Sequence, residues 1–145
     1  MLNLWSAADA EPTVTDDVSA LEPEIDGTDL VATFSPSIDE DTIISGNADL
    51  WTAEAGYNQD LGIFVSVDGG TPQPLAWEES AGFAGTFSPD AVLVETAYPV
   101  TAGNTYVFSL WWKTNRSASP AVIYAGAGPP GGPYSPSSLV VGPEA

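Results

Sequence analysis

The most strand-like run in this 145-residue chain is Thr105-Tyr106-Val107-Phe108-Ser109-Leu110-Trp111-Trp112. Aromatic and β-branched residues dominate it, as they do in strands. Because successive side chains of a strand point to opposite faces, the run divides into two sets. One face carries Tyr106, Phe108, Leu110 and Trp112, and the other carries Val107, Ser109 and Trp111. Both faces are largely apolar, which indicates a strand covered on one side by a second sheet and on the other by a loop or another subunit.

Shorter runs of the same kind recur along the chain from Asp29 onward. They are 30–34, 42–45, 48–53, 61–67, 74–77, 91–98, 121–125 and 138–141. Turn-forming residues separate them, with Asp68-Gly69-Gly70 the strongest turn signal and Ala102-Gly103-Asn104 another. We expect Gly46-Asn47 to turn the chain between the second and third of these runs, and Pro99 to end the strand that begins at 91.

This spacing predicts an all-β fold without helices: a single β-sandwich of eight or nine antiparallel strands. The jelly roll is the first choice, because two four-stranded sheets would use eight of the runs. An immunoglobulin-like sandwich is the alternative, although its pair of cysteines is absent.

Composition changes near residue 29. Residues 1–28 hold seven acidic residues and no basic one, and they show neither a helical stripe nor strand alternation. We therefore expect an extended acidic N-terminal arm, 1–28, before a sandwich domain, 29–145. Leu2, Leu4 and Trp5 would form an apolar anchor at its tip that reaches a neighbouring subunit; the alternative is a frayed, solvated terminus.

The charge balance excludes several classes of partner. Twenty acidic residues against two basic ones give a formal net charge of -18, which repels nucleic-acid phosphates and anionic membrane surfaces. The first residues lack the basic and apolar regions of a signal peptide, and no stretch approaches the roughly 18 apolar residues of a membrane-spanning helix. We therefore expect neither nucleic acid nor membrane as a partner.

The residues that carry most enzyme chemistry are missing. Without histidine or cysteine there is no imidazole base, no thiol nucleophile and no disulfide. Glu78 and Glu79 are adjacent and would point to opposite faces of a strand, so they are poorly placed as a general acid and base. Calcium is the one cofactor that the composition permits, at 39–41 or 58–60, but neither segment has the order of a dedicated calcium loop. We expect a non-enzymatic protein without a cofactor or metal.

Two other groups of residues invite a binding role. Lys113 and Arg116, the only basic residues, follow the strand that contains Trp111, and we expect all three at a contact with a neighbouring subunit. Tyr57, Trp77 and Tyr134 would present stacking faces to a glycan if the chain binds carbohydrate. The competing interpretation is packing, which also uses tyrosine and tryptophan heavily.

Residues 51–141 resemble a recurrent β-sandwich module of bacterial surface proteins and bacteriophage virion proteins. The matching stretches include Gly82-Phe83-Ala84-Gly85-Thr86-Phe87-Ser88-Pro89, Trp112-Lys113-Thr114-Asn115 and segments 53–67, 100–106, 123–129 and 135–139. The resemblance implies a fold rather than an activity, because such modules occur in proteins of many roles. The acidic arm lies outside it.

Two functional hypotheses follow. In the first, the chain is a non-enzymatic structural protein on the outer surface of a virion: a bacteriophage capsid decoration protein that stabilises the head. It would bind the major capsid protein or another virion protein through its arm and a sandwich edge, as a homo-oligomer for which a trimer is favoured. In the second, it is a carbohydrate-binding or adhesive module of a phage tail or of a bacterial surface protein, outside the cell.

Overall fold

The computed structural model describes residues 22–24, 30–52, 59–80, 90–114, 123–125 and 137–144, and these residues form strands and turns without a helix. The strands are β1 (Glu22–Glu24), β2 (Val31–Phe34), β3 (Glu40–Thr52), β4 (Gln59–Val67), β5 (Gln73–Ser80), β6 (Asp90–Val100), β7 (Tyr106–Thr114), β8 (Ile123–Ala125) and β9 (Ser138–Pro143). The predicted all-β class is confirmed. Where the sequence predicted eight or nine strands, seven have four or more residues, and β1 and β8 are three-residue segments.

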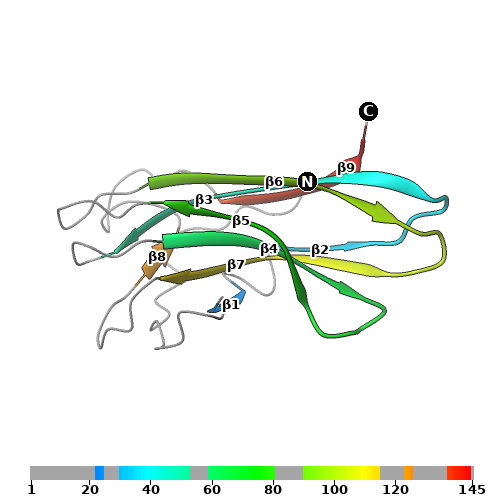
Figure 1. Cartoon of the computed structure of the whole chain (residues 1–145), viewed down its shortest axis with the longest axis horizontal. Helices are drawn as coiled ribbons and strands as arrows, with labels where there is room; N and C mark the ends of the chain where they lie inside the picture. The colour runs from blue at the N-terminus through cyan, green and yellow to red at the C-terminus, as the bar shows by residue number, and fades with distance from the viewer. Residues whose placement is uncertain are drawn as a thin grey trace.

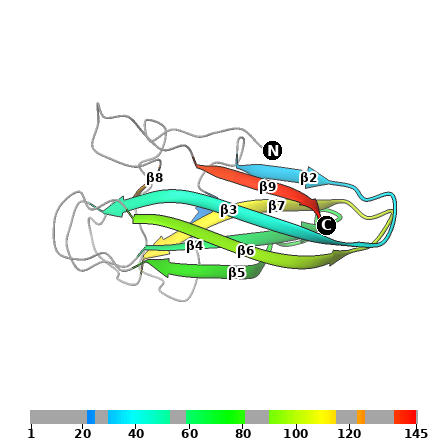
Figure 2. The same cartoon turned by 90° about the horizontal axis from the view of Figure 1, so that it is seen from above.

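The strands form two antiparallel sheets that lie in two layers along the long axis of the molecule (Figure 1). In the larger sheet, β7 pairs with β4 on one side and with β2 and β1 on the other, and β5 lies beyond β4. In the smaller sheet, β3 pairs with β6 on one side and with β9 and β8 on the other. Figure 2 shows the smaller sheet from above, with β3 between β6 and β9.

Alternating residues of both sheets fill the space between them. Of the two faces expected for β7, the one that carries Phe108, Leu110 and Trp112 points inward, since Phe108 and Leu110 are fully buried and Trp112 is 2% exposed. Ile44 and Leu50 of β3 meet this face from the smaller sheet and are also fully buried. Each large apolar side chain buried in this way contributes about 1.5–3 kcal/mol of stability.

The predicted turn at Gly46-Asn47 is wrong, because β3 runs through both residues without a break. Gly46 pairs with Val94 on one side and Leu139 on the other, in the middle of the smaller sheet. A Cβ atom at Gly46 would overlap the side chain of Leu110, which comes from the opposite sheet. The glycine therefore serves close approach of the two sheets rather than a change of chain direction.

The predicted stop at Pro99 is also wrong, because β6 continues to Val100 and Pro99 pairs with Asp41. Within the described residues β6 pairs only with β3, so it is an edge strand of the smaller sheet. A proline lacks the N–H of a ladder and is tolerated in such a position. Pro99 therefore does not end the strand, because at the sheet edge no ladder hydrogen bond depends on its missing N–H.

The turns at one end of the sandwich, on the right in Figure 1, agree better with the sequence. Asp68 and Gly69 have φ of 50° and 76°, as a tight hairpin turn requires, and Gly103 has φ of 90° in the β6–β7 turn. The Asp68 carboxylate accepts a hydrogen bond from the Thr105 N–H at 2.8 Å, and the Asp68 N–H donates to the Thr105 carbonyl at 2.8 Å. These two bonds tie the β4–β5 turn to the chain entering β7.

The predicted arm is described only at β1. Glu22 and Glu24 pair with Trp112 and Trp111 of β7, so these three residues of the 1–28 segment belong to the larger sheet. The anchor residues Leu2, Leu4 and Trp5 lie outside the described residues. The arm and the boundary at residue 29 stay predictions.

Candidate binding surfaces

The described part of the chain gathers no group of three or more acidic side chains that could hold a metal ion. At the first segment considered for calcium, the Asp39 carboxylate accepts a hydrogen bond from the Ala102 N–H at 2.8 Å. At the second, Asp60 lies inside β4 and is 4% exposed, while Asn58 is outside the described residues. Asp39 thus has a structural role, linking the β2–β3 connection to the β6–β7 turn.

The carboxylates of β5 have the geometry expected of neighbours in a strand. Glu78 pairs with Leu61 and Glu79 with Asp60, so the two adjacent residues occupy positions on opposite faces, and both are exposed. This arrangement does not set them against one bond of a substrate. The described residues also contain no helix long and apolar enough to cross a membrane.

The outer face of the larger sheet carries an aromatic pair. The rings of Phe64 on β4 and Trp111 on β7 stack with centroids 4.4 Å apart and an angle of 16° between their planes. The Trp111 indole N–H donates to the Ser109 hydroxyl at 2.8 Å. Phe64 is 9% and Ser109 only 3% exposed, and Val107 and Trp111 are half-buried, so the outer side of β7 is largely covered, as its two apolar faces predicted. We call Phe64, Ser109 and Trp111 the covered face.

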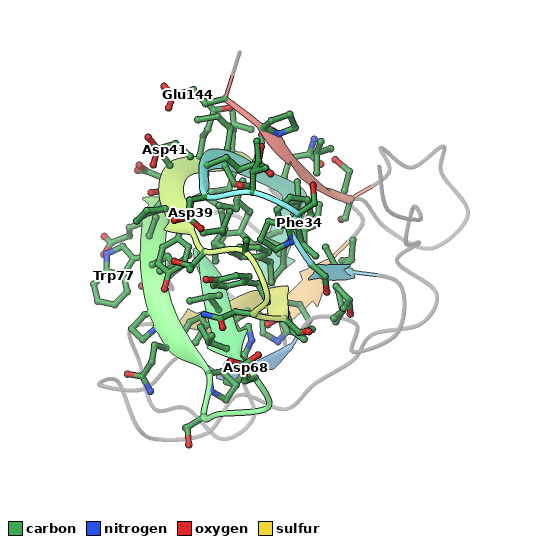
Figure 3. The ribbon with its side chains drawn as sticks, turned by 90° about the vertical axis from the view of Figure 1, so that its right-hand side faces the viewer. Phe34, Asp39, Asp41, Asp68, Trp77 and Glu144 are labelled. Carbon is green, nitrogen blue, oxygen red and sulfur yellow. The ribbon has the colours of Figure 1, made fainter. Side chains whose placement is uncertain are left out.

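An exposed tryptophan lies beside the covered face, on the edge strand β5. Gly62 of β4 pairs with Trp111 on one side and with Trp77 on the other, and both tryptophans therefore lie on the outer side of the larger sheet. Trp77 is 53% exposed and projects from the side of the sandwich in Figure 3. A cavity of about 330 Å³ is lined by Pro74, Leu75, Ala76 and Trp77. We call these four residues the β5 pocket.

The outer face of the smaller sheet has a different character. Its central rows pair Asn47 with Leu93, Ser45 with both Glu95 and Val140, and Ile43 with both Ala97 and Gly142. We call these eight residues, together with Pro99 at the end of β6, the bare face. Leu93 is 62% exposed, and Glu95 is the only charged residue of the set.

Such a face is unusual for this chain. The outer side of an antiparallel sheet that faces water is normally polar. In a protein with 20 acidic residues, many charged side chains would be expected there. Instead the bare face presents Leu93, Ala97 and Pro99 exposed, with Ile43 and Val140 half-buried between the strands. Exposed apolar side chains gathered on one sheet face, here on either side of Glu95, are typical of a contact with another macromolecule.

The site residues predicted from the sequence separate into three groups. Trp111 and Trp77, predicted for different functions, flank Gly62 on the same side of the larger sheet. The backbone of Lys113 pairs with that of Asp60, so the register partner of the only lysine is an acid of the same chain. The remainder lie outside the described residues: Leu2, Leu4, Trp5, Tyr57, Arg116 and Tyr134.

Sequence reasoning missed the bare face. The signal was present in Val92-Leu93-Val94, where three consecutive apolar residues place at least one on the outer side of the strand. The run 91–98 was interpreted only as a strand, and the side on which Leu93 would lie was left open. The pairing with β3 and β9 then shows that small and apolar residues surround it.

Comparison of the chain with protein-family models, with curated proteins and with solved structures found no match.

Proposed function

We propose that this chain is a jelly-roll sandwich and serves as a non-enzymatic structural protein on the outer surface of a bacteriophage virion, as a capsid decoration protein does. The topology that supports the jelly roll is its nested pairing: β2 with β7, β3 with β6 and β4 with β5. This is the pairing of one long hairpin wound on itself, and β9 beside β3 takes the place of the last strand. A first strand beside β9 is not among the described residues, and β1 pairs with β7 instead.

The bare face is the observation that carries the function. Leu93, in the row at one end of the face and on its edge strand, is 62% exposed, and its register partner Asn47 is uncharged. Burying this surface against a protein lattice would remove apolar area from water at a gain of about 25 cal/mol per Å². Glu95 lies within the face and the exposed Asp41 pairs with Pro99 at its end, so two of the chain's 20 acids lie on or beside it, which fits a capsid surface better than it fits a small substrate.

The charge of the rest of the molecule supports the same role. With a net charge of -18 and one acid on the bare face, the protein bound by that face would turn its acidic side chains outward. Particles covered in this way repel one another and remain dispersed. A trimer is the homo-oligomer that a three-fold lattice position would hold.

The proposal is tested by purifying native virus particles on a density gradient and measuring how much of the chain travels with them. We expect the wild-type chain to sediment with the particles and Leu93→Asp to remain at the top of the gradient. Trp77→Ala is the matched control, because it removes another exposed large side chain from a different surface, and we expect it to sediment with the particles. Wild-type protein that never sediments with particles, or Leu93→Asp that still does, would contradict the proposal.

A further inference from the structure

We propose that the β5 pocket is a second binding site, for an uncharged pyranose sugar whose apolar ring face stacks on the indole of Trp77. This inference goes beyond docking by the bare face. It rests on a different strand, in the other sheet, and on side chains that the docking role does not use. Trp77, which is 53% exposed, and the cavity of about 330 Å³ that it helps to line are the observations behind it.

The pocket is built where β5 departs from a regular strand. Ile63 pairs with Ala76 and Phe64 with Pro74, so Leu75 is an extra residue on β5. A β-bulge of this kind bends the edge strand and redirects the side chains beside it. Leu75 and Ala76 are half-buried and pack against the core, so the floor of the pocket is fixed to the sandwich. A binding surface that is already held in place loses little conformational entropy when a ligand arrives.

Gly62 is the register partner of Trp77 on β4. It is itself buried and brings no side chain to the position opposite the indole. A larger residue would lie against the indole, because directly opposed residues of an antiparallel pair have Cβ atoms about 4.5–5.5 Å apart. The volume of the pocket lies at the lower end of the range for small-molecule sites, about 300–1,000 Å³, which suits one or two sugar rings rather than a large ligand.

The chemistry around the indole selects the class of ligand. The lining, Pro74, Leu75, Ala76 and Trp77, is apolar and matches the C–H face of a pyranose. The exposed Glu79 lies two residues further along the strand, on the same side as Trp77, and its carboxylate only accepts hydrogen bonds, which sugar hydroxyls donate. This carboxylate and the net charge of -18 disfavour sialylated, sulfated and uronic-acid sugars.

The experiment titrates the full-length chain with cellohexaose and with mannohexaose, followed by tryptophan fluorescence and by saturation-transfer NMR of the sugar protons. Sialyllactose is the charged comparison. We expect at least one of the two neutral oligosaccharides to bind, with saturation transfer strongest at the ring protons of one pyranose face. Trp77→Ala should weaken binding at least about tenfold, whereas Trp77→Phe should retain part of it. Leu93→Ala, which removes an equally exposed apolar side chain, should bind as the wild type does.

The outcomes separate this proposal from the proposed function. If neither neutral oligosaccharide binds up to its solubility limit, or if Trp77→Ala binds as the wild type does, the sugar site is wrong and docking by the bare face is untouched. Preferential binding of sialyllactose would also overturn it, because the acidic surroundings should repel that sugar. Far-ultraviolet circular dichroism of each variant checks that the fold is retained, and a folded Trp77→Phe variant keeps the test decisive if Trp77→Ala unfolds.

Discussion

The two outer faces of this sandwich both carry large apolar side chains, but Phe64 on one face is buried and Leu93 on the other is exposed. On the larger sheet, the outward residues Phe64 and Ser109 are 9% and 3% exposed, and Trp111 stacks on the first and donates to the second. On the smaller sheet, the outward residue Leu93 is 62% exposed. Hydrophobicity alone therefore does not decide which outward residue is buried. The covered face contributes to the stability of the fold, and the bare face is the surface that we propose for a partner.

Removing a large outward side chain from each face should change the free energy of unfolding by very different amounts. Phe64→Ala should destabilise the protein by about 3–5 kcal/mol, because it empties a buried aromatic position and leaves Trp111 without its stacking partner. Leu93→Ala should change the free energy of unfolding by no more than about 0.5 kcal/mol. Urea denaturation followed by tryptophan fluorescence measures both. Equal losses for the two variants would show that the faces do not differ as described.

The inner faces of the two sheets meet closely where Gly46 of β3 approaches Leu110 of β7. Gly46→Ala should cost about 1–3 kcal/mol, since the added methyl group would overlap Leu110. Combined with Leu110→Val, which makes room on the facing strand, it should cost less than the sum of the two single changes. A double-mutant cycle of urea denaturation measures the coupling. Strict additivity would mean that the two residues do not meet.

A smaller loss of stability is expected at the β4–β5 turn, which lies away from both outer faces. Asp68→Ala should destabilise the protein by about 1 kcal/mol, because the Thr105 N–H loses its acceptor and alanine tolerates positive φ poorly. Asp68→Asn keeps a short polar side chain that adopts this backbone conformation and should cost less. Thermal unfolding of the three proteins gives the order wild type, Asn, Ala. The reverse order of the two variants would assign no role to the side-chain oxygen.

Much of this architecture could be predicted from the local sequence pattern, and each wrong prediction has a physical reason. Alternation in 105–112 correctly divided β7 into two faces, and the four large apolar residues at every second position lie together in the core. Asp68-Gly69 correctly marked a hairpin, because both residues adopt positive φ there. Gly46-Asn47 misled, since a glycine needed for a close approach between sheets resembles a glycine needed for a turn. That approach depends on Leu110, which is far away in the sequence.

The candidate surfaces were harder to anticipate than the fold. Trp77 was singled out as an aromatic residue, but its pocket lies at the bulge at Leu75, which arises from the pairing of β5 with β4. Leu93 looked like one more apolar residue of a strand until its pairing with Asn47 placed it on the outer side of an edge strand. In both cases the deciding information is which strand lies beside which, and that is set by the whole fold rather than by a local run of residues.

The smallest expected change in stability accompanies the largest expected change in binding. Leu93→Asp should leave the free energy of unfolding within about 0.5 kcal/mol of the wild type, because the side chain is exposed. The same change should prevent association with particles, since it sets a second charge on the surface to be buried. Thermal unfolding and gradient sedimentation of one protein preparation test the two halves together. If the variant is much less stable than the wild type, Leu93 contributes to the stability of the fold, and the loss of binding cannot be assigned to the bare face.

An electron cryo-microscopy map of the native particle tests the central claim most directly. The account predicts density for the sandwich on the outer surface of the shell, with the sheet of β6, β3 and β9 against the lattice and Leu93 within the contact. Density in which that sheet faces solvent while β2, β7, β4 and β5 lie against the shell would contradict it, as would particles that carry no density for this chain.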